Sequence, residues 1–288
     1  MKMPSTYERP HTLDVALDIL ASGSWTVLSG GTDIFPGLTD AQAWGRSGPQ
    51  RILDISGIGE LGGIEIRDDE VRLGARATWT EMIEADLPPY FNTLKAAGRD
   101  VGGVQIQNRG TIAGNICNAS PAADGVPALI ALDADVELSG LRGIRRIAVA
   151  KFIQGNRRTA LQDGELVTAI YVPRRSTRAL SNFHKLGARR YLVISIAMVA
   201  VVVDFDESGA INHARVAIGS CSEVAQRMYL LEENMIRRKP DEDLRALVTR
   251  DTLSPLSPID DIRADAGYRM RAAQNLVQRA LAELGTGS

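Results

Sequence analysis

Two short stretches of this chain combine glycines with small polar side chains, a composition typical of loops that hold a ligand through the protein backbone. The first covers residues 28–34 and reads LSGGTDI, directly after an apolar run. Because glycine lets the backbone approach a ligand closely, the arrangement predicts a turn whose amides cradle a phosphate, although a plain strand-to-helix turn would use the same residues. Asp33 would repel a phosphate, so we expect it to brace its own turn, cap the following segment or accept from a ribose hydroxyl.

The second stretch, residues 109–124, is the most distinctive part of the sequence and reads RGTIAGNICNASPAAD. Its apolar content is too low for a core element, and its residue types suit a concave polar turn that binds a ribose and a phosphate. A turn-rich loop whose Asn and Ser side chains bond only to their own backbone would look similar. The candidate ligand contacts are two glycines, four neutral hydrogen-bonding side chains and one carboxylate: Gly110, Gly114, Thr111, Asn115, Asn118, Ser120 and Asp124.

Neither stretch carries the signature of a nucleotide-hydrolysing or Rossmann-type site. Both lack G-K-[ST] and G-x-G-x-x-G, so we expect a diphosphate here to be neutralised by amide dipoles and hydroxyls rather than by a cation. Such a site favours static binding of a cofactor over phosphoryl transfer. The chain has 2 cysteines, too few for an iron–sulfur cluster, 3 histidines without metal spacing, and no G-x-S-x-G elbow. We therefore expect neither a metal site nor a catalytic nucleophile on this chain.

The overall composition is that of a globular protein without a charged or membrane partner. In 288 residues, 44% are hydrophobic and 24% charged, and the net charge is −2, so nothing points to nucleic acid or a membrane surface. The first twenty residues lack the apolar centre of a signal peptide, and the longest apolar run, about 13 residues, is too short to cross a bilayer. We expect a cytoplasmic protein.

The elements that must position the two stretches follow from apolar spacing and turn residues. Residues 13–22 fit a short helix, and the apolar run before the first stretch fits a buried strand. A hairpin turning at 67–69 precedes a helix with Thr78 or Thr80 as N-cap and Glu81 in its first turn. The remaining elements expected in this half are a strand at 51–56, a helix at 88–103, a helix running into a strand at 128–138, and a strand at 164–173.

The composition changes after Pro173, where residues 174–182 read as a basic, polar linker. A long apolar run that fits a buried strand or helix follows, then a strand near 211–222, and helical patterns fill most of residues 223–286. We place a domain boundary near residue 176. The first domain, 1–176, is then α+β with many short strands, and the second, 177–288, is a small sheet with helices.

The two stretches together resemble the FAD-binding (medium) subunits of the molybdenum hydroxylases, the group that includes xanthine dehydrogenase and carbon monoxide dehydrogenase. The second stretch carries the most specific part of the resemblance, which covers nearly the whole chain. Besides the two loops, the matching segments are LGARATWTEM, the helix and strand after the second loop, FHKLGARRYLVISIAMVAVVVD, and SPIDDIRADAGYRMRAA. One departure is Ala113, which stands where the family more often has glycine.

The resemblance implies an α+β fold with a two-lobed FAD-binding domain of the vanillyl-alcohol-oxidase (PCMH) type. Its lobes would meet near residues 55–60 with FAD between them, and a small carbon monoxide dehydrogenase flavoprotein-type domain would close the site. Lys185 matches a family lysine near the flavin, where its charge would raise the reduction potential. Carried over residue by residue, the implied cofactor-binding set is Leu28, Ser29, Gly30, Gly31, Thr32, Asp33, Ile34, Thr111, Ala113, Gly114, Asn115, Asn118, Ser120, Asp124 and Lys185.

The resemblance also implies an electron-transfer role in a heterotrimeric molybdenum hydroxylase. FAD on this chain would take electrons from [2Fe-2S] clusters on a small subunit and pass them to NAD⁺, oxygen, a quinone or another acceptor. A large molybdopterin subunit would select the substrate, and two heterotrimers would pair. A free-standing FAD oxidase or reductase, and a non-enzymatic assembly protein on the same fold, are the alternatives. Cys117 is expected to pack as a small residue, and Tyr191 either stacks on the flavin ring or packs elsewhere.

Overall fold

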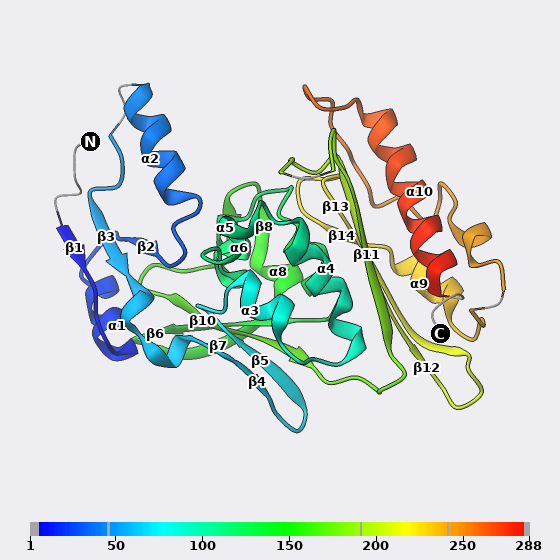
Figure 1. Cartoon of the computed structure of the whole chain (residues 1–288), viewed down its shortest axis with the longest axis horizontal. Helices are drawn as coiled ribbons and strands as arrows, with labels where there is room; N and C mark the ends of the chain where they lie inside the picture. The colour runs from blue at the N-terminus through cyan, green and yellow to red at the C-terminus, as the bar shows by residue number, and fades with distance from the viewer. Residues whose placement is uncertain (1–5, 45–46, 191, 241, 285–288) are drawn as a thin grey trace.

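The computed structural model describes residues 6–44, 47–190, 192–240 and 242–284 (Figure 1). The three larger sheets follow one another along the longest axis of the molecule in the order of the chain, and β8 and β9 form a further two-stranded sheet. A small N-terminal lobe stands at one end, a central lobe occupies the middle, and a C-terminal sheet with its covering helices lies at the other end. None of the helices in the described part of the chain is long and apolar enough to cross a membrane.

The N-terminal lobe is a three-stranded parallel sheet in the order β1-β3-β2. Helix α1, Leu13–Ala21, buries Leu17 and Leu20 in a small core with Leu53, which confirms the helix expected there. Helix α2, Ile34–Ala43, begins directly at the first glycine loop, as the alternative of a strand-to-helix turn implies. The strands are β1 Thr6–Glu8, β2 Thr26–Leu28 and β3 Arg51–Asp54.

The central lobe is a five-stranded antiparallel sheet in the order β4-β5-β10-β6-β7 with helices on one face. The predicted hairpin is β4–β5, and Thr78 is the N-cap of α3 in a full capping box with Glu81. The strands are β4 Ile64–Ile66, β5 Glu70–Gly74, β6 Asp135–Gly140, β7 Gly143–Ala148 and β10 Leu166–Pro173. The helices are α3 Trp79–Glu84, α4 Asn92–Asp100, α5 Val104–Gln107, α6 Ile112–Asn118, α7 Gly125–Ala131 and α8 Val149–Phe152.

The C-terminal sheet is antiparallel in the order β11-β12-β13-β14 and is covered on both faces. Helices α4 and α7 of the central lobe pack on one face, and α9 and α10 pack on the other (Figure 1). All nine residues of β12 are therefore buried, which explains why the longest apolar run is a strand with no polar alternation. The elements are β11 Leu180–Leu186, β12 Ala197–Phe205, β13 Ile211–Gly219, β14 Gln226–Arg227, α9 Tyr229–Met235 and α10 Ala266–Leu284.

Helical structure after residue 223 is less extensive than the sequence predicted. Between α9 and α10 the described chain contains a single 3-10 turn, Leu244–Leu247. The prolines at 240, 255 and 258 interrupt longer helices, while Val248, Leu253 and Leu256 still reach the core beneath α10. The apolar spacing in this segment results from the burial of single side chains and does not indicate an α-helix.

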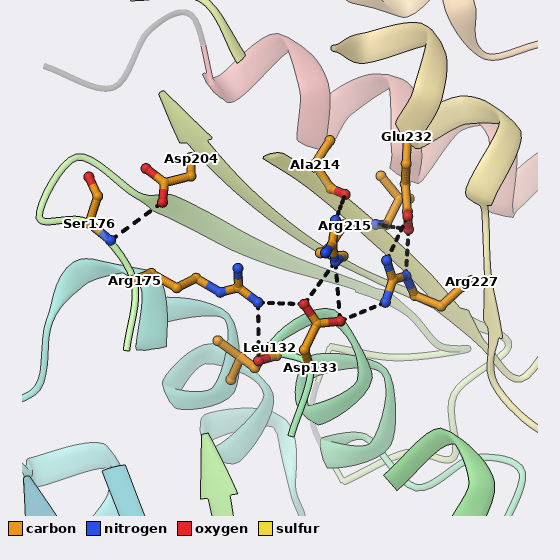
Figure 2. A network of polar contacts seen from close by, with 10 residues as sticks. Leu132, Asp133, Arg175, Ser176, Asp204, Ala214, Arg215, Arg227 and Glu232 are labelled. Carbon is orange, nitrogen blue, oxygen red and sulfur yellow. Dashed lines mark hydrogen bonds and ion pairs between the residues drawn. The ribbon is translucent and has the colours of Figure 1, made fainter. Parts of the chain in front are cut away.

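An ion network joins the central lobe to the C-terminal sheet (Figure 2). Asp133, which follows α7 with a φ of 52°, accepts from Arg175 at 2.7 Å, from Arg215 at 2.8 Å and from Arg227 at 2.8 Å. Arg227 also pairs with the buried Glu232. Arg175 lies in the predicted linker, and the Asp133 carboxylate that it contacts also accepts from Arg215 of the C-terminal sheet. Ion pairs therefore hold the linker against both domains, and it is not a flexible connection.

Candidate functional site

A cavity of about 600 Å³ lies between the N-terminal and central lobes, and both glycine-containing stretches line it. Its volume is within the range of small-molecule and cofactor sites. Val193 and Ile194, in the connection from β11 to β12, complete the wall. Of the fifteen residues predicted to bind a cofactor, thirteen line this cavity: Ser29, Gly30, Gly31, Thr32, Asp33, Ile34, Thr111, Ala113, Gly114, Asn115, Asn118, Ser120 and Asp124.

Gly30 of the first loop is required because the two loops touch, and Gly31 is required because its backbone is left-handed. A Cβ on Gly30 would lie 2.0 Å from the carbonyl oxygen of Arg109, so only glycine allows this approach to the second loop. Gly31 has a φ of 75°, and a Cβ there would meet the ring of Phe35 at 2.5 Å. Leu28 is buried under this turn and does not line the cavity. The first loop is thus shaped by backbone contact between segments eighty residues apart.

The first loop leaves backbone donors available. Within the described part of the chain, no acceptor is found for the N–H groups of Gly30, Gly31 and Thr32, which precede α2 and line the cavity. These amides sit at the start of a ten-residue helix, where the peptide dipoles favour negative charge. These N–H groups are therefore available for the phosphate contact that the sequence predicts, and the contact itself stays a prediction.

The second loop contains a short helix that the sequence prediction missed. Helix α6 buries Ile112 and Ile116 in the central core, and Thr111 caps it by accepting from the N–H of Gly114 at 3.0 Å. Ala113 lies within this helix with ordinary helical geometry, so its methyl group in place of glycine causes no backbone strain. The small polar residues of the stretch concealed the Ile112–Ile116 spacing of a buried helical face.

Neighbouring strand-like pairing fixes the second loop in place. The N–H of Trp79 donates to the oxygen of Gly110 at 3.1 Å, and the N–H of Ile112 donates to the oxygen of Ala77 at 3.0 Å. The capping box of α3 and the cap of α6 are thereby tied side by side at the cavity wall. The loop is held by main-chain bonds, which leaves side chains free to face a ligand.

Several polar side chains of the second loop accept hydrogen bonds from nearby backbone N–H groups, as the alternative of a turn-rich loop without a ligand predicts. Asn115 accepts from Gly125 N–H at 3.3 Å, and Ser120 accepts from Ala122 N–H at 3.3 Å. Their donors remain unused, however: among the described residues, no acceptor is found for the Asn115 amide nitrogen or the Ser120 hydroxyl. Both residues line the cavity, so each offers a donor to a bound molecule.

Asp33 bridges the two lobes. Its carboxylate accepts from the Asn118 amide nitrogen at 2.8 Å, and the Asn118 amide oxygen accepts from Arg157. The sequence left three roles open for Asp33: bracing its own turn, capping the following segment or accepting from a ribose hydroxyl. In the structure its side chain links the first loop to the end of α6. Arg157 lines the same cavity and was missed by the sequence prediction, because nothing in the local sequence of the turn after β8 (Ile153–Gly155) indicates its position.

Asp124 forms a buried ion pair with Lys185. Its two carboxylate oxygens accept from the Lys185 ammonium at 2.7 Å and from the Ser195 hydroxyl at 2.6 Å. Lys185 also donates to the backbone oxygen of Asp100 at 3.2 Å. Burial raises the pKa of the Asp124 carboxyl, and the charge of Lys185 offsets this only in part. Lys185 thus stands behind the cavity wall rather than in it, with its charge compensated by Asp124.

Cys117 lies on the cavity wall and is open to it, so the expectation of a packed residue is wrong. Cys221 is far away and buried, and the two are free thiols. No cluster of three or more metal-binding side chains occurs in the described ranges, and Tyr191 lies outside them.

The donor set of the cavity fits a neutral-to-anionic dinucleotide such as FAD. Unpaired backbone amides, amide nitrogens and hydroxyls line it. Residues 3–175 match the family described as the FAD-binding domain in molybdopterin dehydrogenase, and residues 182–284 match the carbon monoxide dehydrogenase flavoprotein C-terminal domain. The chain belongs to the family of FAD-binding subunits of the molybdopterin dehydrogenases. FAD is its cofactor, and it is a subunit of an oxidoreductase.

Individual relatives agree with this family. The FAD-subunit of nicotinate dehydrogenase from Eubacterium barkeri is 31% identical over 73% of this chain and 71% of its own length. The caffeine dehydrogenase subunit beta from Pseudomonas sp. is 31% identical over 96% and 93%. A chain of the reconstituted CO dehydrogenase from Oligotropha carboxidovorans superposes with a TM-score of 0.90 at 26% identity, covering 99% and 100%. The predicted family, the α+β fold and the FAD cofactor of this FAD-binding subunit are confirmed.

Proposed function

We propose that this chain is the electron-transfer subunit of a heterotrimeric molybdenum hydroxylase. The observation that carries the proposal is the cavity between the lobes, where unpaired amides of the first loop face the polar residues of the second. A small subunit with [2Fe-2S] clusters and a large molybdopterin subunit complete the enzyme, and two heterotrimers pair in the cytoplasm. Its medium-subunit relatives, which are parts of multi-subunit dehydrogenases, support this division of labour.

The residues of the site bind and orient the cofactor, which supplies the two-electron and one-electron redox chemistry when bound. The amides of Gly30, Gly31 and Thr32 hold the diphosphate, and Asn115 and Ser120 donate to the remaining polar groups. We keep the predicted fifteen-residue set as the proposed FAD site, with Leu28 acting from beneath the first loop. We also keep the division into an FAD-binding domain, 1–176, and a C-terminal domain, 177–288.

The C-terminal domain contributes to the site through Lys185 and Ser195. Both hold Asp124 in place, and the neighbouring Val193 and Ile194 give one wall apolar side chains that would exclude water when FAD is bound. Excluding water strengthens each remaining hydrogen bond to the cofactor. In this proposal the chain performs no acid–base step on the organic substrate.

The test uses the purified heterotrimer, compared before and after its FAD is removed and then restored. With FAD removed, we expect the organic substrate still to reduce the iron–sulfur clusters, while reduction of an external acceptor is lost because the exit route for electrons is missing. Adding FAD back should restore acceptor reduction. Cluster spectra and acceptor turnover, recorded on the same sample, separate the two steps.

Two results would contradict the proposal. Undiminished acceptor reduction in the FAD-depleted heterotrimer would show that electrons leave elsewhere. Turnover of an organic donor by the chain alone, without partner subunits, would favour the free-standing oxidase or reductase instead. Buffer exchange without FAD removal is the matched control for losses caused by handling.

A further inference from the structure

The short turn between β8 and β9 (Arg158–Thr159) brings one arginine to the cavity. Arg157 is the single cation among the described residues that line it, whereas three carboxylates, those of Asp33, Asp100 and Asp124, share the lining. Lys185 compensates Asp124, but it lies behind the wall. The cavity that is to receive a diphosphate is therefore more acidic than the two loop sequences suggest.

Backbone conformation and a backbone hydrogen bond fix the position of Arg157. Its backbone has a φ of 58°, a conformation that non-glycine residues rarely adopt, and its N–H donates to the oxygen of Ala119 at 2.9 Å. Ala119, the residue after α6, is itself left-handed with a φ of 46°. Two unusual backbone conformations thus meet in one hydrogen bond that aims the Arg157 side chain along the end of α6.

The guanidinium of Arg157 has N–H donors that find no acceptor among the described residues. Its Nη1 donates to the side-chain oxygen of Asn118, whose amide nitrogen is taken up by Asp33. Within the described part of the chain, neither Nε nor Nη2 of Arg157 has an acceptor, and no carboxylate forms an ion pair with it. One edge of the guanidinium is anchored and the other is open, a geometry suited to a bidentate contact with phosphate oxygens.

We propose that Arg157 binds the diphosphate of FAD through its open edge. The proposal rests on the proposed function and replaces the expectation that amides and hydroxyls alone neutralise the diphosphate. A dianion in a cavity lined by carboxylates loses affinity by repulsion, and a positioned cation offsets this repulsion. Asn118 accepts from Arg157 and at the same time donates to Asp33, so this carboxylate already has a hydrogen-bond donor within the protein.

The experiment compares Arg157→Gln, Arg157→Lys and the control Arg158→Gln in the purified full-length chain after removal of FAD. Arg158 is the next residue along the chain and the first of β9, does not line the cavity, and donates to the backbone oxygen of Gln154. We expect Arg157→Gln to raise the Kd for FAD about 10- to 100-fold, the usual range for loss of charge-assisted hydrogen bonds. Arg157→Lys should recover part of the loss, and Arg158→Gln should bind as wild type.

The dependence of the FAD Kd on sodium chloride separates charge from shape. If Arg157 neutralises the diphosphate, the wild-type Kd rises with salt and Arg157→Gln loses most of this dependence. An unchanged Kd in Arg157→Gln, or a raised Kd with the wild-type salt dependence, overturns the inference and leaves the proposed function standing. A wild-type chain that binds no FAD at all would remove the proposed function instead.

Discussion

At the scale of single residues, Lys185 shows how far a sequence match carries. The resemblance predicts a cation near the flavin, and the structure places Lys185 behind the cavity wall and pairs it with Asp124 at 2.7 Å. Both side chains are buried, so the pair acts on a bound ring as a dipole and not as an isolated charge. The partner of a buried lysine is set by folding of distant segments, and no local sequence signal identifies it.

We predict that Lys185→Met lowers the reduction potential of the bound flavin. Without its counter-ion the Asp124 carboxylate, while ionised, disfavours an electron-rich ring. Burial already raises the pKa of Asp124, and loss of Lys185 raises it further, so the effect should be largest at alkaline pH and fade as acid protonates the carboxyl. Redox titration across pH 6–9 checks this, with Lys185→Met/Asp124→Asn expected to return towards wild type. Equal potentials at every pH would remove Lys185 from the site's electrostatics.

At the scale of elements, the sequence identified the two loops but not how they meet. Their glycines were attributed to ligand approach, yet Gly30 is required first by the carbonyl of Arg109, a contact between segments that only the fold brings together. Hairpin β4–β5, the Thr78 capping box and strand β10 were readable because their signals are local. The sequence overestimated the helical content after residue 223 because irregular segments there also bury apolar side chains.

Gly30→Ala should prevent the two loops from closing. A Cβ at this position would lie 2.0 Å from a backbone oxygen that cannot move without shifting the second loop, so we expect a loss of about 1–3 kcal/mol in the free energy of unfolding together with loss of FAD retention. Gly37→Ala in α2 is the matched control, since its Cβ would meet no atom within 4 Å. Denaturant unfolding and released-flavin measurements test both variants. Full FAD retention in Gly30→Ala would contradict the loop contact.

At the scale of the whole molecule, the Asp133 network joins the central lobe to the C-terminal sheet (Figure 2). Although burial alone would raise it, the hydrogen bond from Arg175 and the charges of Arg215 and Arg227 hold the pKa of Asp133 below its ordinary 3.8. A carboxyl whose pKa is lowered by folding stabilises the fold at pH values above its ordinary pKa. This stabilisation is lost as the pH falls from the ordinary pKa through the lowered one. The network therefore contributes at neutral pH and fades in acid.

Asp133→Asn should destabilise the chain by about 2 kcal/mol at pH 7, because three arginines lose their shared acceptor. The difference from wild type should shrink below pH 4, where the wild-type carboxylate also takes up a proton. Urea unfolding at both pH values measures it. Asp68→Asn, at the exposed turn of hairpin β4–β5, is the control and should stay close to wild type at both. A constant difference across this pH range would assign the effect to shape instead of charge.

Strand β12 has a consequence for how this protein can be divided. Val199 and Val201 belong to the core under α10, whereas the alternate residues Met198, Ala200 and Val202 belong to the core under α7. Breaking the chain between β10 and β11 would leave two fragments that still share one interior. Replacing the C-terminal region by that of a relative would then succeed only if the new β12 side chains pack against α7 of this chain. The border between the two domains therefore divides the covalent chain but not the hydrophobic core.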